Sequence, residues 1–425
     1  MILDQNRYTN RLKSHHNFRE NFRYLVKGSK SLSDQLNENY IKNRKGAIYI
    51  HIPYCTNICT FCNMRRSLKV PSSDYGDLIV KQIKNYSKYA YIKNSKYDAI
   101  YFGGGTPTTL DKEELEKILK AIKDYLPLTE DCEITIETSI SDLTDEKIQM
   151  FKEQGVNRFS IGVQTFSNRG RLILGRRGTK EIVIEKLNKL KKEGFSNVNI
   201  DIIYNYPEQG LADVVEDINI VKKLDLAGFS LYSLIINEKA YLSKKIKNPE
   251  AYYKNNFERE KLFFNSIVEN TKDNGFDFLE LTKLVRSKRD KYKYIVRRYE
   301  GEDTLPLGAG AGGYIGNILV MNSLDLDSYR EEIQNIKSVK CTEMNSLYDF
   351  INKVVGQIQM TKLDLNSIQN ANHGECIKDF MDHLINEGFV EKKNYQYHLT
   401  TKGIFWGNNI SSELSNILIN KFRQL

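Results

Sequence analysis

The length, composition and charge of this chain are those of an ordinary globular protein. Its 425 residues are 40% hydrophobic and 28% charged, with a formal net charge of +9, and the chain is long enough for a large domain plus a smaller one. No apolar run approaches the roughly 18 residues of a membrane span, and the N-terminal sequence lacks the apolar segment of a secretory signal. We therefore expect a cytoplasmic protein with no membrane partner. So modest a positive excess permits an anionic ligand but does not indicate nucleic acid, which we do not expect as a partner.

Six short apolar segments, rich in β-branched and aromatic residues, predict strands in the first 240 residues. They are residues 47–53, 99–105, 133–139, 158–165, 198–204 and 228–236. Amphipathic patterns predict helices between them, for example at 112–126, 145–155 and 180–194. This alternation indicates an α/β protein with a parallel sheet, either an open doubly wound sheet or a partial barrel. In a barrel, functional side chains gather at the C-terminal ends of the strands.

The pattern changes after about residue 345. A helix-like segment at 376–389 precedes residues 390–403, which predict two short strands around a turn. Helix followed by a two-stranded wing suggests a small winged-helix-like α+β domain. The predicted division of the chain is an N-terminal extension (1–44), a barrel (45–240), a barrel extension with a Gly-rich substrate loop (241–344) and a C-terminal domain (345–425).

Three of the six cysteines form a close cluster directly after the first predicted strand. Cys55, Cys59 and Cys62 are separated by three and two residues. Three thiolates match three corners of a 4Fe-4S cluster and leave the fourth iron open to a small molecule. Zinc is the rival, but structural zinc takes four ligands, and the nearest further candidate is His51, four residues before Cys55. The spacing favours the iron–sulfur cluster.

Two glycine-rich segments stand out further along the chain. GGGTP (103–107) ends the second predicted strand, where three glycines allow the backbone to approach a ligand closely. LGAGAGG (307–313) contains the pattern G-x-G-x-x-G, but no strand signal precedes it, so a dinucleotide site is disfavoured. The second segment is interpreted as a close-approach loop over a flat ligand, with a plain flexible turn as the alternative.

The cysteine string carries a resemblance to a known family. Cys-x3-Cys-x2-Cys with Phe61 before the last cysteine is similar to the signature of the radical S-adenosyl-L-methionine (radical SAM) superfamily. YIHIPYCTNICTFC (49–62) resembles the branch that contains oxygen-independent coproporphyrinogen oxidase and the haem chaperones, and the resemblance covers roughly residues 45–425. It implies a partial (β/α)6 TIM-like barrel of radical SAM type, a 4Fe-4S cluster on the three cysteines, and SAM as the source of a 5′-deoxyadenosyl radical.

The resemblance also implies the cofactor contacts. The edge at Gly104 would meet the methionine amino group of SAM, Glu137 would meet its ribose, and Tyr49, which opens the cysteine string, is a further expected contact. The residues that match contacts to a second SAM molecule are Phe61, Gly105, Thr106, Gln164, Arg176 and Asp201. By residue type, Arg176 suits a carboxylate and Asp201 an ammonium or hydroxyl group. The alternatives are a solvated surface charge for Arg176 and a structural strand-end cap for Asp201. No catalytic residue is assigned.

Details of the sequence separate the members of this branch. Met64 stands where coproporphyrinogen oxidase has a further cysteine, and residues 286–299 lack the His-Asn…Tyr-Trp motif of the haem chaperones. Residues 163–181, 286–292 and 305–329 instead resemble the anaerobilin synthases. This resemblance implies a class C radical SAM methyltransferase that methylates haem at a meso position, opens the tetrapyrrole ring and frees iron without oxygen. Haem or a related tetrapyrrole is then the expected substrate, and a flavodoxin-like or other low-potential protein the expected electron donor.

Several alternatives stay open. The same chemistry could act on a quinone or natural product, the enzyme could oxidise coproporphyrinogen, or the chain could be a non-enzymatic haem chaperone that keeps the cluster. The basic, tyrosine-rich stretch 283–299 is compatible with a solvated helix face, with nucleic-acid binding, or with capture of haem propionates beside an aromatic plane. A nucleic-acid-modifying radical enzyme would show strongly salt-dependent polynucleotide binding.

Overall fold

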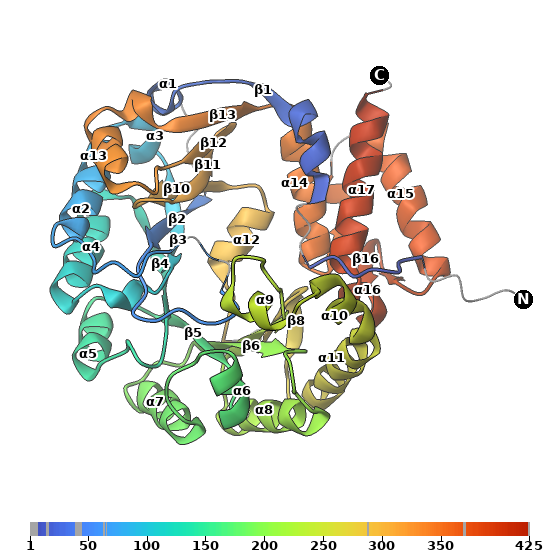
Figure 1. The fold of residues 1–425 in the computed structure, drawn as a ribbon. Helices are drawn as coiled ribbons and strands as arrows, with labels where there is room; N and C mark the ends of the chain where they lie inside the picture. The colour runs from blue at the N-terminus through green and yellow to red at the C-terminus, as the bar shows by residue number, and fades with distance from the viewer. Residues whose placement is uncertain are drawn as a thin grey trace, which may run out of the picture.

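A single curved sheet runs through most of the chain (Figure 1). The computed structural model describes residues 7–13, 17–38, 45–62, 64, 66–286, 289–368 and 371–423. The order of the strands is β1-β13-β12-β11-β10-β2-β3-β4-β5-β6-β7-β9-β8. Among these described residues, no helix has both the length and the apolarity needed to cross a membrane.

The centre of the sheet is parallel and forms the partial barrel. Its strands are β10 (Asp303–Leu307), β2 (Lys45–Ile52), β3 (Lys96–Gly104), β4 (Leu128–Thr138), β5 (Arg158–Gln164), β6 (Val198–Tyr204) and β7 (Gly228–Ser233). Antiparallel strands extend both ends: β1 (Val26–Gly28), β13 (Lys340–Met344), β12 (Ile318–Met321) and β11 (Gly312–Ile315) beyond β10, and β9 (Lys283–Val285) and β8 (Asp277–Glu280) beyond β7. All six predicted strands are therefore present as β2 to β7, although β4 begins before its predicted start and β7 ends early.

The sequence predicted no strand before the second glycine-rich segment, and this prediction was wrong. β10 precedes the glycine-rich loop and pairs in parallel with β2 from Asp303↔Gly46 to Leu307↔Ile50. The segment is short and contains Pro306, a residue that sequence reasoning keeps out of central strands because it cannot donate to the ladder. The parallel part of the sheet therefore continues past β2, the first predicted strand, to β10.

Helices cover the convex side of the parallel strands. They are α2 (Tyr75–Tyr86), α4 (Lys112–Tyr125), α5 (Asp145–Glu153), α7 (Lys180–Lys192) and α8 (Leu211–Lys223). Figure 1 shows them outside the arc of strands. Shorter or peripheral helices are α3 (Ala90–Lys93), η2 (Pro107–Thr109), α6 (Asn168–Ile173), α9 (Tyr241–Lys245), α10 (Pro249–Asn255), α11 (Phe257–Lys272), α13 (Leu326–Gln334) and η3 (Ile336–Ser338). The predicted helix ends at Gly155 and Gly194 are confirmed, because both glycines have the positive φ of a left-handed cap.

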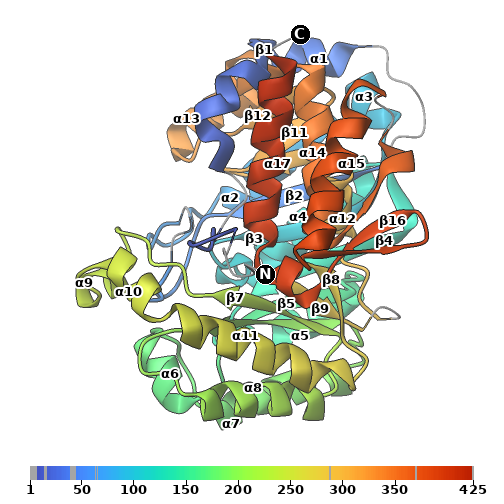
Figure 2. The same ribbon diagram turned by 90° about the vertical axis from the view of Figure 1, so that its right-hand side faces the viewer.

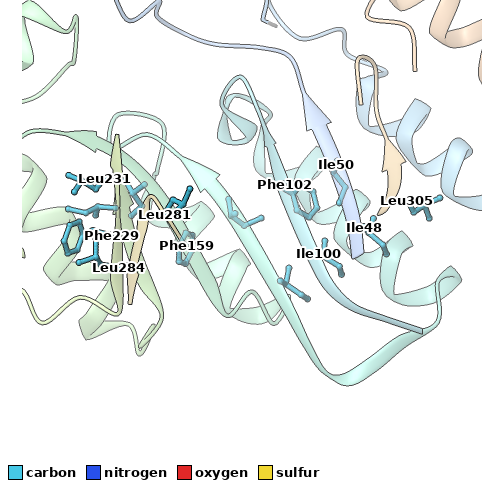
Figure 3. Close-up of a cluster of buried hydrophobic side chains, with 14 of the residues drawn as sticks. Ile48, Ile50, Ile100, Phe102, Phe159, Phe229, Leu231, Leu281, Leu284 and Leu305 are labelled. Carbon is cyan, nitrogen blue, oxygen red and sulfur yellow. The ribbon is translucent and has the colours of Figure 1, made fainter. Parts of the chain in front are cut away.

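The apolar core lies between the sheet and these helices. Ile48, Ile50, Ile100, Phe102 and Leu305 come from three neighbouring strands and are fully or almost fully buried (Figure 3). The register sets Ile48 beside Ile100 and Ile50 beside Phe102. Because successive side chains of a strand point to opposite faces, the residues between them face the concave side.

The concave side is filled by aromatic rings and the short helix α12 (Lys293–Tyr299), which lies inside the arc of strands in Figure 1. Tyr294 of α12 stacks on Tyr101 of β3 and Tyr49 of β2, with ring centroids 4.6 and 5.9 Å apart. We call Tyr49, Tyr101 and Tyr294 the tyrosine layer. It closes the N-terminal part of the barrel and leaves functional groups to the C-terminal ends of the strands.

The C-terminal residues form a separate helical unit with a small sheet. Its elements are α14 (Ser346–Gln359), β14 (Lys362–Asp364), η4 (Leu365–Ser367), α15 (Ala371–Asn386), β15 (Val390–Lys393), β16 (Gln396–Leu399), α16 (Thr401–Phe405) and α17 (Gly407–Phe422). The predicted helix and two strands are α15, β15 and β16, and β14 adds an unpredicted third strand beside β16. Figure 2 shows α14, α15 and α17 side by side.

The N-terminal residues connect this unit to the barrel. Their regular elements are η1 (Asn17–Leu25), β1 and α1 (Leu32–Asn37). Arg7 pairs with Glu413 of α17, whereas Arg11 pairs with Glu260 of α11 on the barrel side. The first described residues therefore act as a strap between the two parts of the chain.

Candidate functional site

The three clustered cysteines lie on a loop that closes on itself between β2 and α2. The Cys55 N–H donates to the carbonyl of Ser67 at 3.0 Å, and the Ser67 N–H donates to the carbonyl of Pro53 at 2.6 Å. Within the loop, the Cys62 N–H donates to the Cys59 carbonyl at 3.2 Å. This closure holds all three thiols at the C-terminal end of β2.

The thiols open into one pocket at the C-terminal ends of the parallel strands. It offers about 850 Å³ that protein atoms do not fill, part of which is open to solvent. The structure brings eleven of the twelve predicted residues into its wall: Cys55, Cys59, Cys62, Phe61, Gly104, Gly105, Thr106, Glu137, Gln164, Arg176 and Asp201. Tyr49 is the exception, because it lies in the tyrosine layer and its hydroxyl is 2.9 Å from Nδ1 of His51. We call this space the cofactor pocket; the roles of its residues stay predictions.

The chemistry of the thiols fits an iron–sulfur cluster. Burial raises the pKa of the Cys55 and Cys62 thiols, so their ionised forms need compensation from a bound metal or a nearby positive charge. Arg66 supplies such a charge beside Cys55 and Cys62, and Nη1 of Arg176 donates to Sγ of Cys59 at 3.0 Å. Among the described residues, no three His, Cys, Asp or Glu side chains converge where a single metal ion could sit. Three thiols that line one pocket suit three corners of a 4Fe-4S cluster.

The glycines at the end of β3 pack against the cysteine loop. A Cβ atom on Gly105 would overlap the backbone carbonyl of Tyr54, and one on Gly104 would lie 2.7 Å from the His51 ring. The Gly105 N–H donates to the Ile52 carbonyl at 2.8 Å. The glycines therefore approach the protein's own cysteine loop and position it against the end of β3, while the predicted approach to a ligand stays a prediction.

Two carboxyl groups face the pocket from neighbouring parts of the sheet. Burial raises the pKa of Glu137 to about 8, with the nearby charge of Asp201 acting in the same direction. Burial also raises the pKa of Asp201, against the opposing charge of Lys283. Asp201 sits in the middle of β6, not at its end, so the alternative of a strand-end cap does not describe it. Hydrogen bonds donated by a bound ligand would stabilise the ionised form of both carboxyl groups.

Gln164 and Arg176 complete the far wall of the pocket. Gln164 ends β5 with a φ of +73°, an uncommon conformation for a residue with a side chain and one that is frequent at functional sites. Arg176 is partly buried and donates to the Gly162 carbonyl as well as to Cys59. The alternative of a solvated surface charge for Arg176 is therefore wrong.

A buried ionic network below the pocket was not predicted. Arg158 of β5 holds Asp290 through two hydrogen bonds, at 2.9 Å from Nε and 3.1 Å from Nη2, and both side chains have no exposed surface. Lys283 lies 4.0 Å from the same carboxylate and 3.5 Å from Oγ of Ser230. Burial lowers the pKa of Lys283 to about 8. In the sequence, Asp290 is hidden within a basic run that gives no sign of entering the barrel.

The remainder of that basic run is paired on the surface. Arg286 and Arg289 both bond to Asp225, Lys293 bonds to Asp131, and Arg297 bonds to Asp98. Residues 287 and 288 of the predicted motif lie outside the described residues. These four basic side chains are paired with carboxylates and are 16 to 28% exposed, so the run is partly buried and not a fully solvated face.

The second glycine-rich loop lies outside the cofactor pocket. A Cβ atom on Gly308 would overlap the His51 carbonyl of β2. The Gly308 N–H donates to Gln82 at 2.9 Å, and the Ala309 N–H donates to the Tyr75 hydroxyl at 2.9 Å, both on α2. These contacts anchor the loop to the barrel wall, so its first glycines serve protein packing.

Comparisons with known proteins agree with this geometry. Residues 49–221 match the Radical SAM superfamily. Anaerobilin synthase from Escherichia coli O157:H7 is 27% identical over 382 residues, which cover 88% of this chain and 85% of that protein. Heme chaperone HemW from Lactococcus lactis subsp. lactis is 26% identical over 86% of this chain and 96% of its own length.

A solved structure shows the same fold. Coproporphyrinogen III oxidase (HemN) from Escherichia coli, described as a radical SAM enzyme, superposes with a TM-score of 0.76 at 20% sequence identity. The match covers 92% of this chain and 95% of that one. The predicted partial barrel with a smaller C-terminal domain is thereby confirmed.

Proposed function

From the premise that this chain belongs to the radical SAM superfamily, we propose that it is an enzyme that methylates haem and opens the tetrapyrrole ring without oxygen, releasing iron. The superfamily uses a 4Fe-4S cluster and SAM, and the three thiols of the cofactor pocket suit that cluster. The similarity to anaerobilin synthase over most of both chains supports this particular reaction.

The observation that carries the proposal is the composition of the cofactor pocket. One continuous wall contains both the cysteine, glycine and Glu137 set expected at a first SAM and the Gln164, Arg176 and Asp201 set expected at a second. A methyltransferase of this class needs two such sites, because one SAM molecule starts the radical reaction and the other supplies the carbon. Two molecules of SAM are therefore part of the proposal.

The residues of this chain have distinct roles in it. Cys55, Cys59 and Cys62 hold the cluster, which when bound supplies the low-potential electron for cleaving the sulfonium of SAM. Arg176 donates to Cys59 and so offsets negative charge at the ligands. Glu137, as a carboxylate, accepts hydrogen bonds from the two ribose hydroxyls of a SAM molecule.

Asp201 binds and orients the second SAM molecule in this scheme. Its carboxylate is buried, with Ser230 as a hydrogen-bond partner and Lys283 as the opposing charge. A cofactor ammonium group would replace part of the solvation that Asp201 loses on burial.

An electron donor needs access to the cysteines from outside the barrel. A separate hollow, lined by Cys62, Met64, Arg66, Lys239 and a few neighbours, reaches Cys62 from the surface. Met64 is 50% exposed, and the lining carries two cations, Arg66 and Lys239, against one acid, Glu238, an excess that suits an acidic partner. A flavodoxin-like or other low-potential protein is the proposed donor at this hollow.

The test is anaerobic incubation of cluster-reconstituted protein with haem, SAM and a low-potential reductant. Loss of the haem Soret band together with a linear, methylated tetrapyrrole in the mass spectrum supports the proposal. Haem that binds and is recovered unchanged would contradict it and favour a haem chaperone such as the HemW relatives. A porphyrinogen substrate that is oxidised while haem is left intact would favour coproporphyrinogen oxidation.

A further inference from the structure

Three polar side chains lie in one row across the sheet, from the cofactor pocket to the antiparallel strands beyond β7. Asp201 of β6 is the direct neighbour of Ser230 in β7, and Ser230 is the direct neighbour of Lys283 in β9. Paired residues of neighbouring strands point to the same face of a sheet, whereas Phe229 and Leu284 point into the apolar core (Figure 3). Since Asp201 lines the cofactor pocket, the other two side chains face the concave side as well. We call Asp201, Ser230 and Lys283 the polar row.

Hydrogen bonds connect the members of the polar row. Nζ of Lys283 donates to Oγ of Ser230 at 3.5 Å, and the Ser230 side chain is hydrogen-bonded to the Asp201 carboxylate. Lys283 has no exposed surface, so its ammonium group is solvated by protein groups in place of water. A single hydroxyl group therefore connects a buried positive charge to the carboxylate that faces the cofactor pocket, and successive hydrogen bonds of this kind strengthen one another.

A second carboxylate near Lys283 already has a closer cation. Asp290 accepts hydrogen bonds from Nε and Nη2 of Arg158 at 2.9 and 3.1 Å, and a third from the Tyr292 N–H at 3.0 Å. Lys283 lies 4.0 Å from this carboxylate, which is beyond hydrogen-bond distance. Arg158 thus offsets the charge of Asp290, and the charge of Lys283 is left to act on other carboxyl groups.

Glu280 is the competing carboxyl group next to Lys283, which it neighbours across β8 and β9. It accepts a hydrogen bond from the Thr282 hydroxyl at 2.6 Å and one from the Tyr299 hydroxyl at 3.5 Å. Burial raises the pKa of Glu280, against the hydrogen bond from Thr282 and the charge of Lys283. Lys283 can therefore serve Glu280 or Asp201, and the two roles predict different effects of mutation.

The ionised form of Asp201 depends on its neighbours because burial opposes it. Burial raises the pKa of Asp201, and the charge of Lys283 is the strongest of the influences that lower it, ahead of the hydrogen bond from Ser230. The charged and titratable groups that face Lys283 are Arg158, Asp201, Glu280, Asp290 and Tyr292. Those that face Asp201 are Lys283, Arg158, Arg176, Glu137, Tyr101 and Tyr232.

We propose that Lys283 is a positioning residue for the second SAM molecule: through Ser230 it keeps Asp201 in the ionised form that pairs with the ammonium group of that molecule. This inference rests on the proposed function, because that scheme places a second SAM molecule at Asp201. It gives the first residue of the basic stretch 283–299 a role in cofactor binding.

The first experiment counts SAM molecules bound without turnover. Cluster-reconstituted protein without reductant is dialysed to equilibrium against labelled SAM, and the unaltered protein should bind two molecules per chain. Lys283→Met keeps an unbranched side chain and removes the charge. It should bind the first molecule with unchanged affinity and the second about tenfold more weakly, since a shift of one pKa unit at Asp201 corresponds to a factor of ten.

Lys191→Met is the matched control. Lys191 is a partly buried lysine of α7 that donates to the Leu224 carbonyl at 2.8 Å, on the convex side of the sheet, so its loss should leave both SAM affinities unchanged. Far-UV circular dichroism and cluster iron content should be the same in all the proteins. Equal affinity for the second molecule in Lys283→Met and Lys191→Met would overturn the inference.

The pH dependence separates the charge of Lys283 from the shape of its side chain. The affinity for the second molecule is compared between Lys283→Met and the unaltered protein, because this ratio cancels the titrations that both share, those of SAM and Glu137. The loss should be largest near about pH 6.5, where the variant protonates Asp201. It should fall toward one near about pH 8.5, because Lys283, with a pKa of about 8, is then neutral in the unaltered protein as well. A loss of the same size at every pH would assign Lys283 to packing and overturn the inference.

Two neighbouring variants test the route of the effect. Ser230→Ala removes the hydroxyl group between Lys283 and Asp201 and should also weaken binding of the second molecule; an unchanged affinity would contradict Ser230 as the connection. Glu280→Gln removes the competing carboxylate and should not weaken it, because more of the Lys283 charge then acts on Asp201. A loss in Glu280→Gln as large as that in Lys283→Met would show that Lys283 and Glu280 form a structural pair, which would overturn the inference.

The outcomes for this inference and for the proposed function are distinct. An unaltered protein that binds one SAM molecule per chain would overturn the second-cofactor part of the proposed function, and the inference with it. Two bound molecules, both insensitive to Lys283→Met, would overturn the inference and leave the proposed function standing. Binding of the second molecule that depends on Lys283, in a protein that leaves haem unchanged, would support the inference and contradict the proposed reaction.

Discussion

The Arg158–Asp290 pair gives the sharpest prediction about what holds the barrel together. Both side chains are fully buried, two hydrogen bonds of 2.9 and 3.1 Å join them, and Arg158 also lies 4.0 Å from the Tyr292 ring centroid. Asp290→Asn would remove the carboxylate that two buried cations, Arg158 and Lys283, share, and would leave Arg158 with the more distant Glu133 at 4.0 Å. Removing one partner of a buried pair costs about 3–5 kcal/mol, a large share of the roughly 5–15 kcal/mol by which a domain is stable.

The assay is denaturant unfolding followed by far-UV circular dichroism, with Asp225→Asn as the matched control. Asp225 also accepts from two arginines of the same run but is exposed, so its loss should cost less than about 1 kcal/mol. A loss for Asp290→Asn as small as that of Asp225→Asn would refute the reasoning. The pH dependence of the free energy of unfolding gives a second test of Asp290→Asn.

Burial alone would raise the pKa of Asp290, but the charge and hydrogen bonds of Arg158 hold it below its usual range. A carboxyl whose folded pKa is depressed contributes stability above its unfolded pKa of about 3.9 and loses it as the pH falls through the folded value. The part of the stability difference between the unaltered protein and Asp290→Asn that Asp290 itself contributes should therefore shrink as the pH falls below about 3.9. A stability difference that grows as the pH falls would contradict a depressed pKa for Asp290.

Three further predictions concern the cofactor pocket. Cys59→Ala should lose iron and sulfide after anaerobic reconstitution. The control Cys132→Ala changes a buried cysteine outside the pocket and should keep both. Iron retained by Cys59→Ala at the level of this control would contradict the assignment of Cys59 as a cluster ligand. Asp201→Ala should impair methyl transfer more than 5′-deoxyadenosine formation, measured by chromatography of the same reaction, and equal losses would remove the second-cofactor role. SAM affinity should rise between pH 6.5 and 8, because Glu137 has a pKa of about 8 and binds ribose hydroxyls best when ionised. In Glu137→Gln this pH dependence of SAM affinity should disappear. A pH profile that is unchanged in the variant would show that another group titrates.

Local signals account for the part of the fold that the sequence predicts. The strands β2 to β7 have continuous apolar runs because a parallel sheet is covered on both faces, by helices outside and by rings inside. Parallel strands bring their C-terminal residues to one edge of the sheet. This geometry accounts for Glu137 near the end of β4, whereas Asp201 in the middle of β6 was assigned through the family resemblance; both line the cofactor pocket with the cysteines.

The features that the sequence does not predict depend on contacts between distant residues. β10 becomes a strand by pairing with β2, more than 250 residues earlier in the chain, and its own sequence is too short and too interrupted to indicate a strand. Asp290 stands among basic residues, and its buried role appears once Arg158 is known to point into the barrel. Tyr49, expected from the resemblance as a cofactor contact, lies in the tyrosine layer and not in the wall of the cofactor pocket, and its role stays a prediction.

The central claim is that one enzyme transfers a SAM-derived carbon to haem and opens the ring. The most direct measurement is an anaerobic reaction with haem, a low-potential reductant and SAM carrying an isotopic label in its methyl group, analysed by mass spectrometry with a parallel assay for free iron. The account predicts a linear tetrapyrrole that carries the label and iron released in equal amount. Recovery of unlabelled, intact haem from a protein that holds its cluster and cleaves SAM would contradict it.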